Sequence, residues 1–205
     1  MDYRGRIPER GTAMTDPTSR TTEPGPATGS ANAAPDPAPL SPVLPPDTVA
    51  AWVAADRVQE TARLRAQLAP VVELVSPLTD RFRFTGPGEV MAVLESAFEL
   101  LDDIEITALT GSGRDWVLHG TNTLDGANLE EIQWLHLAAD GRIDRITLFI
   151  RPAPAAISLL AKIGPPLARR GALLPGAALA SRAAAPIAAV LRLTERVVMG
   201  RLKRS

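Results

Sequence analysis

The strongest constraint in this sequence is a change of hydrophobic period after Asp103. From Ile104 to Arg151 apolar and polar residues alternate, as in half-buried β-strands, and glycine-containing turns interrupt the alternation. Asp125-Gly126 and Asp140-Gly141 are dipeptides that favour tight hairpins. The stretch therefore predicts a four-stranded antiparallel meander, with strands over 104–109, 116–124, 129–137 and 142–151 and a further turn at 111–113.

The residues before the meander predict two helices and two short extended segments. Asp47 is suited to an N-cap, and the following residues lack Gly and Pro until Pro70, which predicts one helix with Trp52 and Asp56 on its apolar stripe. A short strand follows over 71–75. Phe82 and Phe84 then alternate with arginines in an extended segment, and a second helix begins at 86–89 and carries an apolar stripe.

The two ends of the chain differ from this centre. Residues 1–46 hold ten of the nineteen prolines and almost no large apolar residue before Leu40, which predicts a disordered tail. Residues 153–205 are rich in Ala and Leu and predict helices over 155–168 and 186–203. The apolar run 171–191 contains a central arginine and two prolines, which argues against a transmembrane helix.

Charge is divided unevenly along the chain. Residues 47–151 carry a net charge of −8, whereas residues 152–205 carry +8. The acidic centre argues against nucleic-acid binding. The basic end must therefore face the acidic core, an anionic membrane surface or a partner protein. If it faces a membrane, residues 171–205 are the segment expected to make the peripheral contact.

Several kinds of site are disfavoured by composition. The chain has no cysteine and only two histidines, His119 and His136, without the spacing of a metal motif, so we expect neither a metal nor a cofactor. Residues 1–20 carry charges and lack an apolar run, so they predict no signal peptide. The expected location is the cytoplasm, with membrane association left open.

Two segments carry a resemblance to a known family. SPLTDRFRFTGPGEVMAVL and ADGRIDRITLFIRP, in this order, resemble segments of the nuclear transport factor 2-like superfamily, and most closely its SnoaL-like branch. The resemblance covers about 47–152. It implies an α+β fold, in which a curved, cone-shaped antiparallel sheet wraps around the N-terminal helices and encloses an apolar pocket. It also places Phe82 and Phe84 at the lip or wall of the cone, where they would contact a ligand or, equally, be ordinary core aromatics beside exposed arginines. Enzymes and non-enzymes share this fold, so the fold does not fix the function.

A two-residue turn at Asp125-Gly126 assigns the side chains of the meander to two faces. One face is mainly apolar and should be the concave one; it collects Trp116, Leu118, Asn122, Leu129, Glu131, Gln133, Leu135, Leu137, Ile146, Leu148 and Ile150. The other, convex face collects Val117, His119, Thr121, Glu130, Ile132, Trp134, His136, Arg145, Thr147, Phe149 and Arg151. This amphipathic convex face suggests a homodimer interface, and both histidines are interpreted as interface or surface residues.

The polar residues on the concave face define the candidate site. Glu131 should have a raised pKa there, which suits proton transfer, and Asp80 in the preceding loop is a second candidate catalytic carboxyl. The candidate ligand-binding residues, expected to contact a small apolar molecule, are Trp116, Asn122, Gln133, Phe82 and Phe84. Against these roles, Glu131 could lie at a solvated rim and Asp80 in an exposed loop.

Two functions remain open from the sequence. The first is a small-molecule pocket protein, with isomerase or cyclase chemistry by a carboxyl acid–base. The second is a non-catalytic interaction protein whose C-terminal helices dock to a membrane or a partner. The only tyrosine is Tyr3, so the tyrosines used by related isomerases and dehydratases have no counterpart, and whether the chain is an enzyme is left open. An enclosed cavity at Glu131 would favour the first function, and a plugged one the second.

Deletion of residues 1–46 should leave the melting temperature nearly unchanged, because this segment offers little apolar surface for a core. Thermal unfolding of the truncated and full-length chains would measure this. A large drop in melting temperature would instead place part of the segment in the core.

Overall fold

The computed structural model describes residues 44–199, so residues 1–43 of the predicted tail 1–46 lie outside the described part. Three helices precede or interrupt the first strands: α1 (Asp47–Arg57), α2 (Thr61–Ala66) and α3 (Gly86–Phe98). The strands are β1 (Leu68–Val75), β2 (Phe84–Thr85), β3 (Asp102–Ser112), β4 (Asp115–Leu124), β5 (Ala127–Leu137) and β6 (Ile143–Arg151). The C-terminal elements are α4 (Ala153–Arg169), α5 (Pro175–Arg182), α6 (Ala185–Thr194) and the π-helix η1 (Glu195–Met199).

The six strands form one curved sheet in the order β2-β1-β6-β5-β4-β3. The predicted meander β3–β6 is present and antiparallel. The sheet as a whole is mixed, however, because β1 pairs with β6 in parallel. The predicted α+β class with a curved sheet around helices is confirmed, and the expectation of a purely antiparallel sheet is corrected at β1.

The face assignment made from the β4–β5 turn is confirmed. Asp125 and Gly126 both have positive φ, at 52° and 73°, as a type I′ turn requires. Trp116 pairs with Leu135 and Leu118 pairs with Gln133, as the two-residue turn predicts. Buried side chains therefore alternate along β4 and gather on the concave face.

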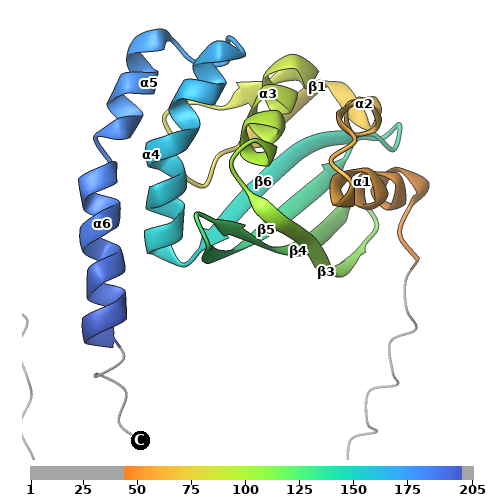
Figure 1. Cartoon of the computed structure of the whole chain (residues 1–205). Helices are drawn as coiled ribbons and strands as arrows, with labels where there is room; N and C mark the ends of the chain where they lie inside the picture. The colour runs from red at the N-terminus through yellow and green to blue at the C-terminus, as the bar shows by residue number, and fades with distance from the viewer. Residues whose placement is uncertain (1–43, 200–205) are drawn as a thin grey trace, which may run out of the picture. The chain divides into compact units, whose positions relative to one another are not determined.

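Four helices cover the concave face (Figure 1). The sheet and helices α1 to α4 share one hydrophobic core, to which α1 contributes Trp52, α3 contributes Val90, and α4 contributes Leu159, Ile163 and Leu167. Helix α4 contacts β4, β5 and β6, and both α5 and α6 pack against α4. The predicted C-terminal helices are thus present, and the first of them is part of the core.

Three local expectations were wrong. The single helix predicted after Asp47 is split into α1 and α2, where Gln59 adopts a φ of 54°. The apolar run 171–191 contains α5, which periodicity had not indicated. Gly111 does not turn the chain but lies within β3, and the turn follows at Gly113.

Gly111 is required by a close backbone approach. A Cβ at this position would lie 2.4 Å from the Asp115 carbonyl oxygen and 2.7 Å from Trp116 Cα, and its φ is +154°. Gly113, by comparison, has a φ of +57° and open space where a Cβ would be. Position 111 therefore tolerates a side chain less well than position 113 does.

Gly111→Ala should lower the free energy of unfolding by roughly 2–4 kcal/mol, because backbone atoms must move to admit the methyl group. The matched control Gly113→Ala should cost only about 1 kcal/mol for the left-handed conformation. Urea unfolding of the two variants measures the difference. Equal losses would show that the β3–β4 approach is looser than described.

Candidate functional site

Gln133 lies at the centre of a buried hydrogen-bond cluster between β5 and α1. Its Nε2 donates to Asp56 Oδ2 at 2.9 Å and to Glu131 Oε1 at 3.0 Å. Its Oε1 accepts a hydrogen bond from Trp52 Nε1 at 2.9 Å. One amide thus bridges two carboxyl groups from different elements, and we call these four residues the Gln133 cluster.

Both carboxyl groups of the cluster bind protons more tightly than usual. The pKa of Asp56 is raised from 3.8 to about 7, first by burial and then by the negative charge of Glu131, while the hydrogen bond from Gln133 opposes the shift. Burial also raises the pKa of Glu131, again against the Gln133 hydrogen bond. Asp56 is 1% exposed, whereas Glu131 retains partial exposure, so the Asp56 residue is the less accessible to solvent of the two.

Gly120 on β4 makes room for the Glu131 side chain. The two residues are paired across the strands. A Cβ on Gly120 would lie 3.3 Å from Glu131 Cγ and 3.4 Å from the Glu105 carbonyl oxygen. The absence of a side chain at position 120 therefore lets the Glu131 carboxyl lie over β4, next to the sheet-edge strand β3.

Asn122 adds an unpaired amide beside the cluster. It is 3% exposed, and neither its Oδ1 nor its Nδ2 has a hydrogen-bond partner. It pairs with Leu129, so it is a diagonal neighbour of Glu131 on the same face of the sheet. A buried amide without partners costs about 1–3 kcal/mol, so a polar molecule bound at this point would be stabilised.

The structure brings together only some of the predicted site residues. Glu131, Gln133 and Asn122 lie on the concave face, as predicted. Trp116 is 2% exposed, and its Nε1 donates to the Gly113 carbonyl oxygen at 3.1 Å, so it belongs to the core and closes the β3–β4 turn. Phe84 is also a core residue, at 5% exposure.

Asp80 and Phe82 belong to a different part of the molecule. They line a pocket of about 340 Å³ formed by the loop after β1. Phe82 is 44% exposed and packs edge-to-face on Phe84, with ring centroids 5.3 Å apart. Asp80 and Glu131 therefore lie in different parts of the molecule, and the geometry does not bring these two carboxyl groups into one site.

Asp56 is the member of the cluster that sequence reasoning missed as a site residue. The available signal was its place on the apolar stripe of the first helix, where a carboxyl is unexpected. The position of Asp56 on this stripe did not identify its hydrogen-bond partner, because Gln133 lies 77 residues away along the chain.

The interior above the cluster is densely filled. Pockets of 340–390 Å³ lie at the 75–83 loop, between α6 and the β4–β5 turn, and at two further places lined mainly by convex-face and β3 side chains. Glu131 also lines one of these two pockets, and Asn122 lines the other. None of these pockets is lined by Trp116 or Gln133. Helix α4 packs over the same core, so the cavity predicted between Trp116, Leu118, Leu135 and Leu148 does not coincide with any of them.

The two histidines lie on the convex face, and His119 lines a pocket together with Glu131 of the Gln133 cluster. His119 contacts Thr107 and Glu130, and His136 Nδ1 donates a hydrogen bond to Asp115 Oδ1 at 3.0 Å. The contact with His136 lowers the pKa of Asp115. Phe149 and Trp134 are 52% and 41% exposed on this face. A homodimer through it stays a prediction.

Within residues 44–199 no group of three or more His, Asp or Glu side chains is arranged to hold a metal ion. Over the same residues, no helix combines the length and apolarity needed to cross a bilayer. Peripheral contact of 171–205 with a membrane stays a prediction, and residues 200–205 lie outside the described part.

Comparison with known proteins identifies the fold. No protein-family profile matches the chain, and no curated protein does. A solved structure of an uncharacterised protein with a cystatin-like fold from Silicibacter pomeroyi superposes with a TM-score of 0.54 at 20% identity, over 67% of this chain and 94% of that one.

A steroid delta-isomerase from Pseudomonas aeruginosa gives a TM-score of 0.53 at 23% identity, over 61% of this chain and 89% of that one. At these identities the likeness concerns the fold alone. The predicted resemblance is thereby confirmed at the level of the fold, and assignment to the SnoaL-like branch stays a prediction. The described chain has the nuclear transport factor 2-like fold.

Proposed function

We propose that the concave face binds a small, largely apolar molecule and that the Asp56–Glu131 pair acts on it as an acid–base group. The observation that carries the proposal is the Gln133 cluster, in which two desolvated carboxyls share one amide donor. Such a pair exchanges protons near neutral pH, where ordinary carboxyls are fully ionised.

The two carboxyls take different parts in this proposal. Burial and the charge of Glu131 raise the pKa of Asp56 to about 7, so Asp56 holds its proton below about pH 7. Glu131 is also the one of the two that keeps some exposure, which makes it the base that a ligand can reach. The pair titrates as a unit, so its apparent pKa values belong to both residues.

Asn122 supplies a hydrogen-bond donor that the missing tyrosines would otherwise provide. Its Nδ2 is buried and unpaired beside Glu131. If the ligand carries a carbonyl group and a carbon–carbon double bond on either side of one carbon, Glu131 takes a proton from that carbon, and the electron pair moves onto the oxygen. The Asn122 amide then donates to that oxygen, and return of the proton to another carbon completes an isomerisation in which no atom is lost.

The packing of α4 decides how the ligand enters. Leu159, Ile163 and Leu167 bury the concave face beneath α4, so the ligand must either displace part of α4 or enter beside Glu131 near β3. This filled interior is the observation that favours the second candidate function, a non-catalytic interaction protein. Ligand binding therefore has to be tested separately from chemistry.

Glu131→Gln should reduce proton abstraction from a small apolar probe such as nitrobenzisoxazole by about tenfold or more, because a positioned base contributes at least that much. The wild-type rate should rise with pH as Glu131 loses its proton, over a range above that of an ordinary carboxyl because burial raises the Glu131 pKa. Glu105→Gln, which removes an exposed carboxyl from neighbouring β3, is the matched control and should retain the wild-type rate. Equal rates in the wild type and Glu131→Gln would exclude Glu131 as the base.

Ligand binding has its own measurement. Native mass spectrometry of the chain purified from its host should detect a bound small molecule, and Asn122→Leu should lower its occupancy. Loss of turnover with retained binding would separate acid–base chemistry from pocket formation. An empty wild-type protein together with inactivity toward the probe would favour the interaction function.

Asp56→Asn should flatten the pH dependence of stability. The native pKa of Asp56, about 7, exceeds its unfolded value of 3.8. The native state therefore holds a proton that the unfolded state has lost over this range, and the free energy of unfolding falls as pH rises from about 4 to 7. The upper limit of this loss is on the order of 4 kcal/mol.

The measurement is urea unfolding of wild type and Asp56→Asn near pH 5 and pH 8. Titrating groups other than the coupled Glu131 contribute equally to both proteins, so the difference reports the Asp56–Glu131 pair. The variant should be relatively more stable at the higher pH. Parallel pH profiles for the two proteins would show that Asp56 is not desolvated in the native state.

A further inference from the structure

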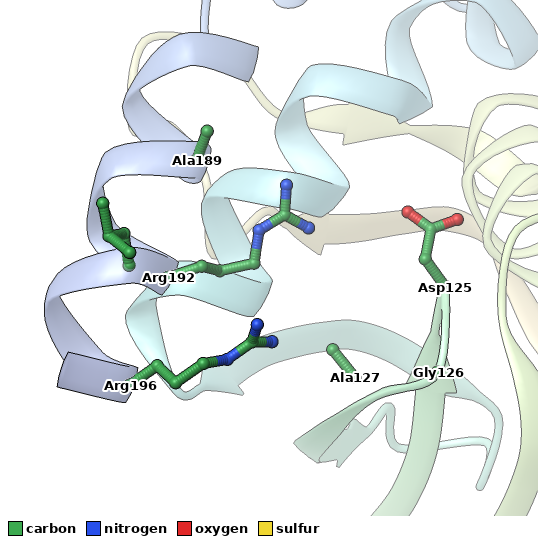
Figure 2. Close-up of a pocket in the computed structure, with 7 residues that line it drawn as sticks. Asp125, Gly126, Ala127, Ala189, Arg192 and Arg196 are labelled. Atoms are coloured by element: carbon green, nitrogen blue, oxygen red, sulfur yellow. The ribbon is translucent and has the colours of Figure 1, made fainter. Parts of the chain in front are cut away.

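A second site lies between α6 and the β4–β5 turn, away from the Gln133 cluster. It is a pocket of about 390 Å³ lined by Asp125, Gly126, Ala127, Ala189, Arg192, Leu193 and Arg196. Figure 2 shows the side chains of Arg192 and Arg196 extending from the last helical turns toward the strand turn that carries Asp125.

The two arginines of this pocket have no partner among the described residues, which include Glu195 between them in sequence. Other basic residues of the C-terminal segment are paired. Arg169, the last residue of α4, and Arg170, its C-cap, form ion pairs with Glu99 of the acidic core, and Arg170 also reaches Glu95. Arg192 and Arg196 thus differ from Arg169 and Arg170, although all four belong to the same basic segment.

Asp125 does not neutralise this pair of arginines. Both of its carboxylate oxygens contact Lys162 Nζ, which comes from α4. With Asp125 already matched by Lys162, the pocket is left with two positive charges. Arginines four residues apart on a helix repel each other slightly, and an anion between them would turn this repulsion into attraction.

We propose that this pocket binds a phosphate group or a similar dianion through Arg192 and Arg196. The guanidinium group presents planar, paired donors that match phosphate oxygens. Two such groups converge on one side of the pocket, while Gly126 leaves the turn free of a side chain. The site is independent of the acid–base pair on the concave face.

The phosphate can come from a soluble molecule or from a lipid headgroup, and the neighbouring surface bears on that choice. Ile187, Val190, Leu193 and Val197 are 56%, 63%, 63% and 43% exposed on α6 and η1. Their spacing of three to four residues places them along one stripe of the helix, beside the pocket. A lipid would engage both this stripe and the arginines, whereas a soluble phosphate would need only the arginines.

Isothermal titration of the full-length protein with inorganic phosphate, at constant ionic strength, tests the site directly. Saturable binding is expected, and Arg192→Gln/Arg196→Gln should weaken it by about tenfold or more, since each charged hydrogen bond lost is comparable to that factor. The matched control Arg65→Gln/Arg182→Gln removes the same charge from exposed positions outside the pocket and should leave binding unchanged.

Flotation with vesicles distinguishes the two sources of phosphate. If the ligand is a lipid headgroup, phosphatidylcholine vesicles containing phosphatidic acid should retain the protein, and vesicles without it should not. Ile187→Ser/Val190→Ser should then abolish vesicle binding but preserve binding of inorganic phosphate. If vesicles are not bound while phosphate is, the ligand is soluble.

Two results would overturn the proposal. One is the absence of saturable phosphate binding by the wild-type protein. The other is equal weakening by the pocket pair and the control pair, which would indicate attraction by net charge alone. Circular dichroism of each variant verifies that the helices are retained, and the single variant Arg196→Gln, at an exposed position, provides a second measurement of the same loss.

Discussion

The two-residue turn at Asp125–Gly126 is the constraint on which the sheet and both candidate sites depend. Its positive φ angles at both residues fix the register of β4 against β5, and that register assigns every side chain of these strands to one face. A slip of one residue would move Gln133 and Glu131 to the convex side and leave Asp56 buried without a donor. The same turn carries the carboxylate that Lys162 of α4 contacts, and it forms one wall of the arginine pocket.

Period and turn chemistry are local properties, and what they control could be predicted from the sequence. The meander, its faces and the inward placement of Asn122, Glu131 and Gln133 followed from alternation and two Asp-Gly dipeptides. The parallel pairing of β1 with β6 did not follow, because it joins segments about 70 residues apart without a short turn to fix their register. The break between α1 and α2 was missed for a different reason. Gln59 adopts a left-handed conformation that its residue type does not signal.

The candidate site shows the same division between local and long-range information. The alternation of side chains along the strands identified three polar residues on an apolar face, but it did not identify the hydrogen bonds made by these residues. Gln133 uses its amide to join β5 to α1, and this explains why Asp56 tolerates burial on the apolar stripe of a helix. Asp80 and Phe82 were grouped with Glu131 because related folds place that loop near a pocket. Here the loop forms a pocket of its own, since Phe84 fills the core and Phe82 turns outward against it.

The opposite charges of the core and the C-terminal segment are satisfied only in part. Exposed ion pairs such as Arg169–Glu99 contribute little to stability because water screens them, so the apolar side of α4, not its charges, holds this helix on the sheet. Helix α6 contributes much less apolar surface to that core: Ala188 is buried, while several larger side chains remain exposed. Its arginines therefore cannot be explained as anchors to the acidic core. Two unpaired guanidinium groups beside an exposed apolar stripe are more simply understood as a binding surface, which makes the end of the chain a functional element and not only a cover for the sheet.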